Sequence, residues 1–172
     1  LIACGITSRK IFVIDTEKGS ALLEQGKPGI PEFYHAELTP PFSPARYIEY
    51  IQTAVSEGAA CIIVDSLSHA WTGTGGILDE HGRIASTKNN NQWSAWRHLT
   101  PEHNRLIDTM LNCDAHLIAT MRTKTAWEVV DGDNGKKQPV KLGLKPEQRE
   151  GMEYEFTVVL DLSVEGHVAT SS

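Results

Sequence analysis

Two short apolar runs, each ending in an aspartate, constrain the fold of this chain more than any other feature of its sequence. The first covers residues 11–15 and leads to Glu17, and the second covers residues 61–65 and is followed by Ser66. Continuous runs rich in β-branched residues are typical of strands buried on both faces of a parallel sheet. The carboxyl ends of such strands border the ligand crevice of an open α/β sheet. The sequence therefore predicts that carboxylates and a hydroxyl group gather at a ligand-binding edge.

Strands and helices alternate along the rest of the chain, which predicts an α/β fold with a mostly parallel sheet. Strands are expected at residues 10–15, 35–38, 60–65 and 116–122, a hairpin at 126–130 and 139–142, and closing strands at 156–162 and 167–170. Helices are expected to end at Gly5, to run from the N-cap Ser43 to Gly58, and to begin at Thr100. Residues 71–92 are rich in Gly, Ser, Thr and Asn, and they are expected to form a long polar stretch.

The composition fits one globular domain: the chain has 172 residues, of which 40% are hydrophobic and 22% are charged. The net charge of −6 argues against nucleic-acid binding by the whole surface, but it leaves room for a local basic loop. Cys4, Cys61 and Cys113 show no paired spacing, which favours a reducing compartment, and Cys61 is expected to be a small buried residue. No apolar run approaches the ~20 residues of a membrane span, and no secretory signal is found. We therefore expect a cytoplasmic protein.

Four stretches, taken in their order along the chain, carry a family resemblance. They are residues 14–21, 63–66, 117–122 and 145–151. Together they resemble the RecA-like ATPase core, and most closely the phage-encoded AAA-family nucleotide-binding proteins linked to single-strand annealing and recombination. The resemblance extends over residues 11–162. It implies a RecA-like, mostly parallel sheet flanked by helices, with an antiparallel hairpin near the C-terminus.

The resemblance assigns roles to the residues at the two strand ends. Glu17 stands where RecA-like proteins carry the glutamate that orients the attacking water, and Asp65 matches the Walker B carboxylate that holds Mg²⁺ through its water shell. Ser66 either assists by hydrogen bonding or caps the segment that follows. The cofactors that the resemblance implies are ATP and Mg²⁺.

Basic residues later in the chain match the phosphate-sensing positions of the family. Arg122 stands where RecA-like proteins place a polar residue that senses the γ-phosphate, although RecA itself has glutamine there. The arginine either binds phosphate through charge-assisted hydrogen bonds or pairs with a carboxylate. Lys124, Lys145 and Arg149 are candidates for fingers that reach the nucleotide of a neighbouring subunit, and the alternative for each is an ordinary solvated side chain.

Two segments match the DNA-contacting loops of RecA-like proteins. Positive charge beside an aromatic ring is the combination that single-strand binders use. The candidates are Lys124, Trp127, Lys136, Lys137 and Lys141 in the predicted hairpin, and Arg83 and Lys88 in the polar stretch. The alternative is a solvated hairpin, since Asp131 and Asp133 dilute its charge. The implied partners are single-stranded DNA, further copies of the chain in a ring or filament, and a phage single-strand-binding or annealing protein in the cytoplasm of a bacterial host.

The phosphate-binding loop of this family is missing from the sequence. No G-x-x-x-x-G-K-[ST] motif occurs in the 172 residues. Since the chain begins Leu-Ile-Ala-Cys-Gly, we expect residues 1–172 to be one RecA-like core that starts just after its phosphate-binding loop. Such a piece would lack a central strand, would be weakened or associated with another copy, and would not hydrolyse ATP by itself.

Two other functions stay open on the same residues. A non-catalytic DNA-binding or assembly module would keep the fold and lose the nucleotide chemistry. A metal-dependent nuclease would use Asp15, Glu17 and Asp65. The seven histidines show no zinc-binding pattern, and Trp93 and Trp96, at helical spacing, are expected to pack in the core.

Overall fold

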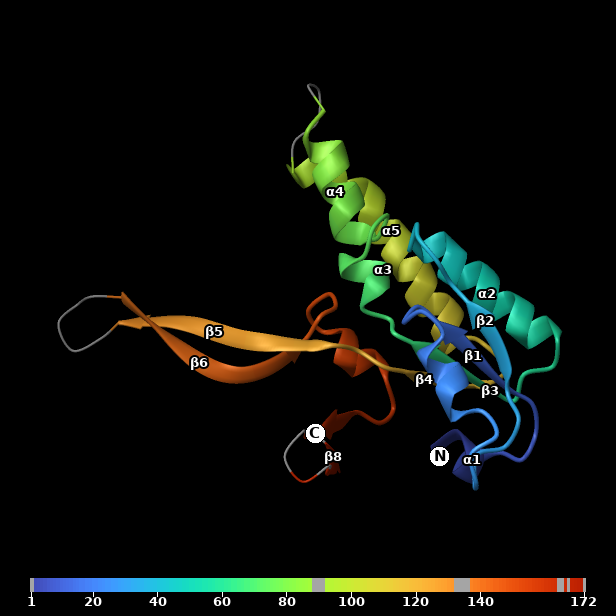
Figure 1. The fold of residues 1–172 in the computed structure, drawn as a ribbon. Helices are drawn as coiled ribbons and strands as arrows, with labels where there is room; N and C mark the ends of the chain where they lie inside the picture. The colour runs from blue at the N-terminus through green and yellow to red at the C-terminus, as the bar shows by residue number, and fades with distance from the viewer. Residues whose placement is uncertain (1, 88–91, 132–136, 164–165, 167, 172) are drawn as a thin grey trace.

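A four-stranded parallel sheet forms the centre of the molecule. The computed structural model describes residues 2–87, 92–131, 137–163, 166 and 168–171. The strands of the sheet are β1 (Ile11–Asp15), β2 (Tyr34–Glu37), β3 (Cys61–Asp65) and β4 (His116–Ala119), in the order β2-β1-β3-β4 (Figure 1). All of their pairings are parallel, so the predicted α/β fold is confirmed.

The two faces of the sheet are covered by different helices, because successive side chains of a strand point to opposite faces. Ile14 and Ile62 belong to the larger core, and Ile11 and Cys61 pack against Ala3 in a smaller one. The larger core contains α2 (Pro44–Ser56) and α5 (Gln92–Leu111), and the smaller one contains α1 (Ile2–Ile6). Cys61 is fully buried, which confirms that it serves as a small apolar residue.

The glycine-rich stretch after β3 is helical rather than a long loop. Two helices, α3 (His69–Thr72) and α4 (Ile77–Ala85), are joined by a short connector over residues 73–76. A Cβ atom added to Gly76 would lie 2.7 Å from the carbonyl oxygen of His69, and one added to Gly75 would lie 2.4 Å from Cβ of Pro41. The prediction of a polar loop over 71–92 is therefore wrong for the described residues, because the glycines serve close packing.

Helix α5 begins at Gln92, and not at Thr100 as predicted, and Pro101 lies inside it. A proline inside a helix costs roughly 3 kcal/mol. A buried stripe nevertheless continues across the proline, formed by Ala95, Leu99, Leu106 and Met110. We infer that the burial of this stripe outweighs the cost of Pro101, since an amphipathic face contributes more to a helix than its local propensities do.

The two tryptophans at the start of α5 differ in their surroundings. Trp96 stacks on Trp71 with ring centroids 5.8 Å apart, which confirms the expected packing for that residue. Trp93 is 82% exposed, so the same expectation is wrong for Trp93. It lies in the first turn of the helix, before the buried stripe begins.

Two antiparallel strand pairs lie outside the central sheet. They are β5 (Thr123–Asp131) with β6 (Lys137–Pro146), and β7 (Leu160–Leu162) with β8 (Ala169–Ser171), and the short 3-10 helices are η1 (Ser20–Glu24) and η2 (Met152–Glu155). The hairpin is confirmed and is longer than predicted, while the closing strands are shorter. Strand β4 is also shorter than predicted, and as an outer strand it is half-buried rather than buried. None of the described helices has the length and apolar character needed to cross a membrane.

The tight connector between α3 and α4 gives a test with a matched control. Gly76→Ala should lower the free energy of unfolding by roughly 1–3 kcal/mol, because its methyl group meets backbone oxygens at 2.7 and 2.9 Å. Gly82→Ala, in open space on α4, should raise it by about 0.5–1 kcal/mol, since alanine favours a helix over glycine. Urea unfolding of both variants measures the difference, and equal effects would contradict this packing.

Candidate functional site at the carboxyl edge of the sheet

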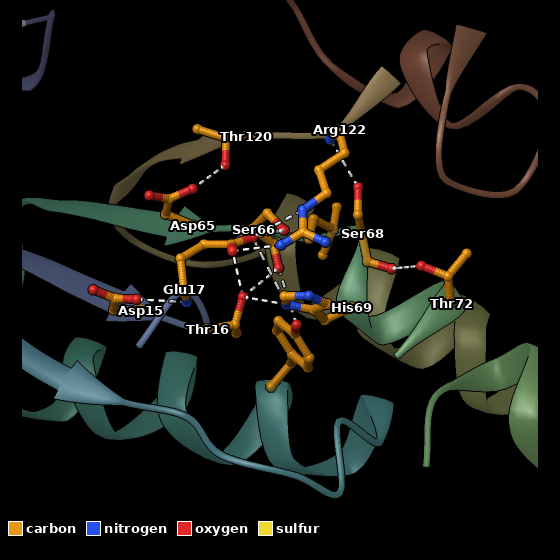
Figure 2. Close-up of polar contacts among 12 residues, drawn as sticks. Asp15, Thr16, Glu17, Asp65, Ser66, Ser68, His69, Thr72, Thr120 and Arg122 are labelled. Carbon is orange, nitrogen blue, oxygen red and sulfur yellow. Dashed lines mark hydrogen bonds and ion pairs between the residues drawn. The ribbon is translucent and has the colours of Figure 1, made fainter. Parts of the chain in front are cut away.

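Polar residues that follow three neighbouring strands meet at one edge of the sheet (Figure 2). Asp15 and Asp65, the last residues of β1 and β3, are register partners, so these strands end at the same level. The main-chain N–H of Thr16 donates to the carbonyl oxygen of Asp65 at 2.6 Å, and that of Thr120 donates to Val64 at 3.0 Å. These backbone bonds hold the residues after each strand side by side.

Asp15 serves the structure of this edge rather than a ligand. Its side chain is fully buried, and its carboxylate accepts hydrogen bonds from the main-chain N–H groups of Glu17 at 2.6 Å and Ala21 at 3.1 Å. His35 Nε2 lies 3.2 Å from the same carboxylate. Burial alone raises the pKa of Asp15, but the two main-chain donors and His35 lower it below the ordinary value of 3.8. Because protein donors surround Asp15, it does not fit the metal-ligand role that the nuclease hypothesis gave it.

Glu17 is held as a carboxylate at the centre of the site. Arg122 donates to it from Nε, 3.1 Å from Oε1, and from Nη2 to Oε2. The hydroxyl of Ser66 donates to Oε1 at 3.1 Å. Burial raises the pKa of Glu17. The Arg122 guanidinium and the Ser66 hydroxyl together lower it by more than burial raises it, so the pKa lies below its ordinary value. The arginine thus pairs with a carboxylate in this structure, the second of the two possibilities for Arg122.

Ser66 belongs to the site and does not cap the following helix. Its hydroxyl bonds Glu17, and α3 begins at His69, with Ser68 at its N-cap position. The carbonyl oxygen of Ser66 accepts a hydrogen bond from the buried Tyr47 hydroxyl at 3.0 Å. Of the two possibilities for Ser66, the structure therefore supports hydrogen bonding within the site.

Two further site residues, Thr16 and His69, were not singled out from the sequence. Thr16 Oγ1 accepts a hydrogen bond from the N–H of Ser66 at 2.8 Å and lies 2.7 Å from Nδ1 of His69. The His69 ring stacks on Phe42, and its Nδ1 lies 3.9 Å from the Glu17 carboxylate. Burial lowers the pKa of His69, and the pKa stays below its ordinary value although the nearby Glu17 carboxylate opposes this. The signal available in the sequence was their position: Thr16 directly follows the first strand, and His69 lies three residues after Ser66.

Asp65 offers a carboxylate oxygen to a metal ion. Its Oδ1 accepts a hydrogen bond from the Thr120 hydroxyl at 2.6 Å, and no hydrogen bond to Oδ2 is found among the described residues. Within the same residues, no group of three or more His, Cys, Asp or Glu side chains could hold a metal. Mg²⁺ is commonly bound by one or two carboxylates together with substrate phosphates, so this donor set fits Mg²⁺ only with a nucleotide present.

Three predicted finger residues lie apart from this cluster. Lys124 and Lys145 are register partners on the hairpin, and Arg149 follows it. No contact of their side chains with Glu17 or Asp65 is found among the described residues. Their action on a neighbouring subunit stays a prediction.

The predicted DNA-binding residues lie on two elements. In the hairpin, Trp127 is the register partner of Lys141, and Asp131 is the partner of Lys137. Arg83 lies on α4 rather than on a loop, and its Nη2 pairs with Glu80 one turn away at 2.6 Å. Lys88 and Lys136 lie outside the described residues.

Comparison with known proteins gave one result. A family model described as an AAA domain matches residues 4–172. The chain belongs to this AAA-domain family. No curated protein and no solved structure matches it. Membership of the AAA-domain family indicates a nucleotide-binding, ATPase-type protein, typically one that uses Mg²⁺, and this agrees with the carboxylates at the sheet edge.

The buried carboxylate of Asp15 predicts a pH dependence of stability. Its pKa is lower in the folded protein than in the unfolded chain, so its stabilisation is present above about pH 4 and is lost as the pH falls through the folded-state value. Asp15→Asn should destabilise the protein by about 1–3 kcal/mol at pH 7. The variant should also lose less stability than the parent between pH 7 and pH 3.

Urea unfolding at the two pH values measures both effects. The exposed residue Asp108 provides the control, since Asp108→Asn should change neither value by more than about 0.5 kcal/mol. An equal loss of stability on acidification in Asp15→Asn and the parent protein would contradict this role of Asp15.

Proposed function

We propose that this protein is an ATP-binding, Mg²⁺-dependent ATPase of the RecA-like type. The proposal depends on one observation above all. Glu17 and Asp65 stand at the ends of two adjacent strands whose register is fixed, and each is held by hydrogen bonds from neighbouring residues. Phosphoryl transfer depends mainly on positioning and on electrostatic stabilisation, so a fixed pair of carboxylates suits it.

In this proposal the two carboxylates have separate tasks. Asp65 holds Mg²⁺ through its water shell, while Thr120 fixes the orientation of the carboxylate. When bound, Mg²⁺ neutralises the charge that develops on the phosphate oxygens. Glu17, kept anionic, orients the attacking water, and the Ser66 hydroxyl fixes its position.

Arg122 connects the proposed nucleotide site to the hairpin. It directly precedes β5, its N–H donates to Ser68 Oγ at 2.9 Å, and its carbonyl oxygen accepts from the N–H of Glu147 at 2.7 Å. Its guanidinium bonds Glu17. We propose that, when a nucleotide binds, the guanidinium releases Glu17 and binds the γ-phosphate instead. This change would free Glu17 to orient the attacking water and would move the start of β5, which Arg122 directly precedes.

We further propose that the protein acts on single-stranded DNA in the recombination or replication of a phage or prophage. The hairpin residues Trp127, Lys136, Lys137 and Lys141 would contact the strand, which would place an aromatic ring beside positive charge. A ring or filament of copies, together with a phage single-strand-binding or annealing protein, would complete the assembly.

A second candidate is a non-catalytic assembly module that keeps the fold. It is favoured by the ion pair between Arg122 and Glu17, which occupies the proposed catalytic carboxylate. A protein of this kind would associate or bind DNA without turning over nucleotide.

The catalytic proposal predicts that both carboxylates are needed for turnover. In the full-length protein, Glu17→Gln and Asp65→Asn should each lower the rate of ATP hydrolysis about 100-fold or more, since a positioned base contributes roughly 10²–10⁴-fold. Glu32→Gln, at an exposed site away from the sheet edge, should leave the rate unchanged. Phosphate release with and without single-stranded DNA measures these rates. Normal turnover by both site variants would refute the assignment, and a parent protein without turnover would favour the assembly module.

The DNA proposal predicts a change in the salt dependence of binding. Each lysine that contacts phosphate contributes about 0.7 to the slope of log affinity against log salt concentration for single strands. Lys137→Ala with Lys141→Ala should therefore weaken binding and lower the slope by about 1.4. Arg9→Ala, an exposed residue before β1, is the matched control. Fluorescence anisotropy with a labelled oligonucleotide measures the slope, and an unchanged slope would remove the hairpin from the DNA-binding surface.

A further inference from the structure

The hairpin formed by β5 and β6, here called the arm, has exposed side chains along much of its described length. It runs away from the central sheet (Figure 1). Val129 is 61% exposed, Leu144 is 65% exposed and Val140 is 43% exposed. An isolated two-stranded ribbon is marginally stable in water, and exposed apolar side chains of this kind mark interaction sites. Val140 lies on one face of the arm and Val129 and Leu144 on the other, so each face exposes apolar area that a partner surface would cover.

The positive charge of the arm indicates that a surface covering it would be acidic. Residues 123–146 contain five lysines and three acidic residues, a net charge of +2, so the rest of the chain carries −8. Lys124 and Lys145 are register partners, and both are exposed. Like charges directly opposite each other destabilise a ribbon. No ion pair of either lysine is found in the described part of the chain, so acidic groups from another surface would stabilise the pair.

The segment that follows the arm, residues 147–162, has the complementary composition and is here called the acidic strip. It contains five acidic residues against the single basic residue Arg149, a net charge of −4. Glu150, Glu155 and Asp161 are exposed. Tyr154 is 86% exposed and Val158 is 67% exposed, so the acidic strip also presents apolar area.

The acidic strip is anchored to the body of the protein at its beginning. The buried side chain of Gln148 donates to the carbonyl oxygen of Leu67 at 3.1 Å and lies 3.4 Å from His103. Met152 is 3% exposed and belongs to the larger core. The first part of the strip is therefore a fixed surface on which another element can dock.

We infer that the arm of one copy docks on the acidic strip of a second copy of this chain. Within one chain the arm points away from the sheet, and among the described residues no ion pair joins the two surfaces. The docked surfaces differ from each other, so the contact is heterologous and repeats from copy to copy. Contacts of this kind build a ring when the rotation closes and a filament when it does not.

The docking face of the arm is distinct from the positions proposed for DNA. Side chains alternate between the two faces of a ribbon, so Lys124, Lys145 and Val140 occupy positions on one face. Lys137 occupies a position on the other face, together with Val129 and Leu144. The inference does not depend on nucleotide hydrolysis, and its failure would leave the assignment of Glu17 and Asp65 intact.

Charge exchange in the full-length protein tests the interface. The arm variant Lys124→Glu with Lys145→Glu, and the strip variant Glu150→Lys with Glu155→Lys, should each weaken self-association at least tenfold. The fourfold variant should regain it, and so should an equimolar mixture of the two double variants, because opposite charges face each other again. Arg9→Glu and Glu32→Lys, at exposed sites elsewhere, should have no effect.

Sedimentation velocity on nucleic-acid-free protein, over a range of concentrations and at low salt, measures the association, and circular dichroism checks that each variant is folded. Rescue in the fourfold variant and in the mixture supports the interface, since a folding defect would not be rescued. A parent protein that stays monomeric, double variants that associate normally, or a fourfold variant that stays dissociated would each overturn it. Association that requires single-stranded DNA and survives both double variants would assign the arm to DNA alone.

Discussion

The parallel pairing of β1 with β3 is the constraint on which the rest of the site depends. It places Asp15 level with Asp65, and the next residues of both strands then bond each other through Thr16 and Ser66. A slip of one residue would turn each strand's buried side chains to the other face, so the two cores fix the register. Glu17 and Asp65 are brought together by the same burial that stabilises the sheet.

Within this frame the acidic residues at the edge have different tasks. Asp15 is fully buried and accepts a hydrogen bond from the main chain of the turn that carries Glu17, so it fixes the position of that turn. Glu17 is half-buried and shares its carboxylate between Ser66 and Arg122, and the arginine also forms the root of the arm. A movement of Arg122 at the edge of the sheet would therefore act directly on the hairpin, because Arg122 is covalently joined to the first residue of β5.

The sequence predicts the strands well because their apolar runs are continuous, and it places Glu17, Asp65, Ser66 and Arg122 at one edge. It fails where tertiary packing overrides local signals. The glycines of residues 73–76 resemble a loop but allow close helix packing. Pro101 resembles a helix start but lies inside α5, because the buried stripe of that helix continues past the proline. Thr16, His69 and Thr120 lie after strand ends or close to Ser66, but the contacts that bring them into the site depend on how the elements pack, which a single sequence does not show.

The central claim is that the carboxyl edge of β1 and β3 binds a magnesium nucleotide. A crystal structure of the full-length protein with Mg²⁺ and a non-hydrolysable ATP analogue tests it most directly. We expect the metal within one water molecule of the Asp65 carboxylate, and the γ-phosphate beside Glu17 and Arg122. A triphosphate bound elsewhere, with the Glu17–Arg122 ion pair intact and no metal near Asp65, would contradict the account.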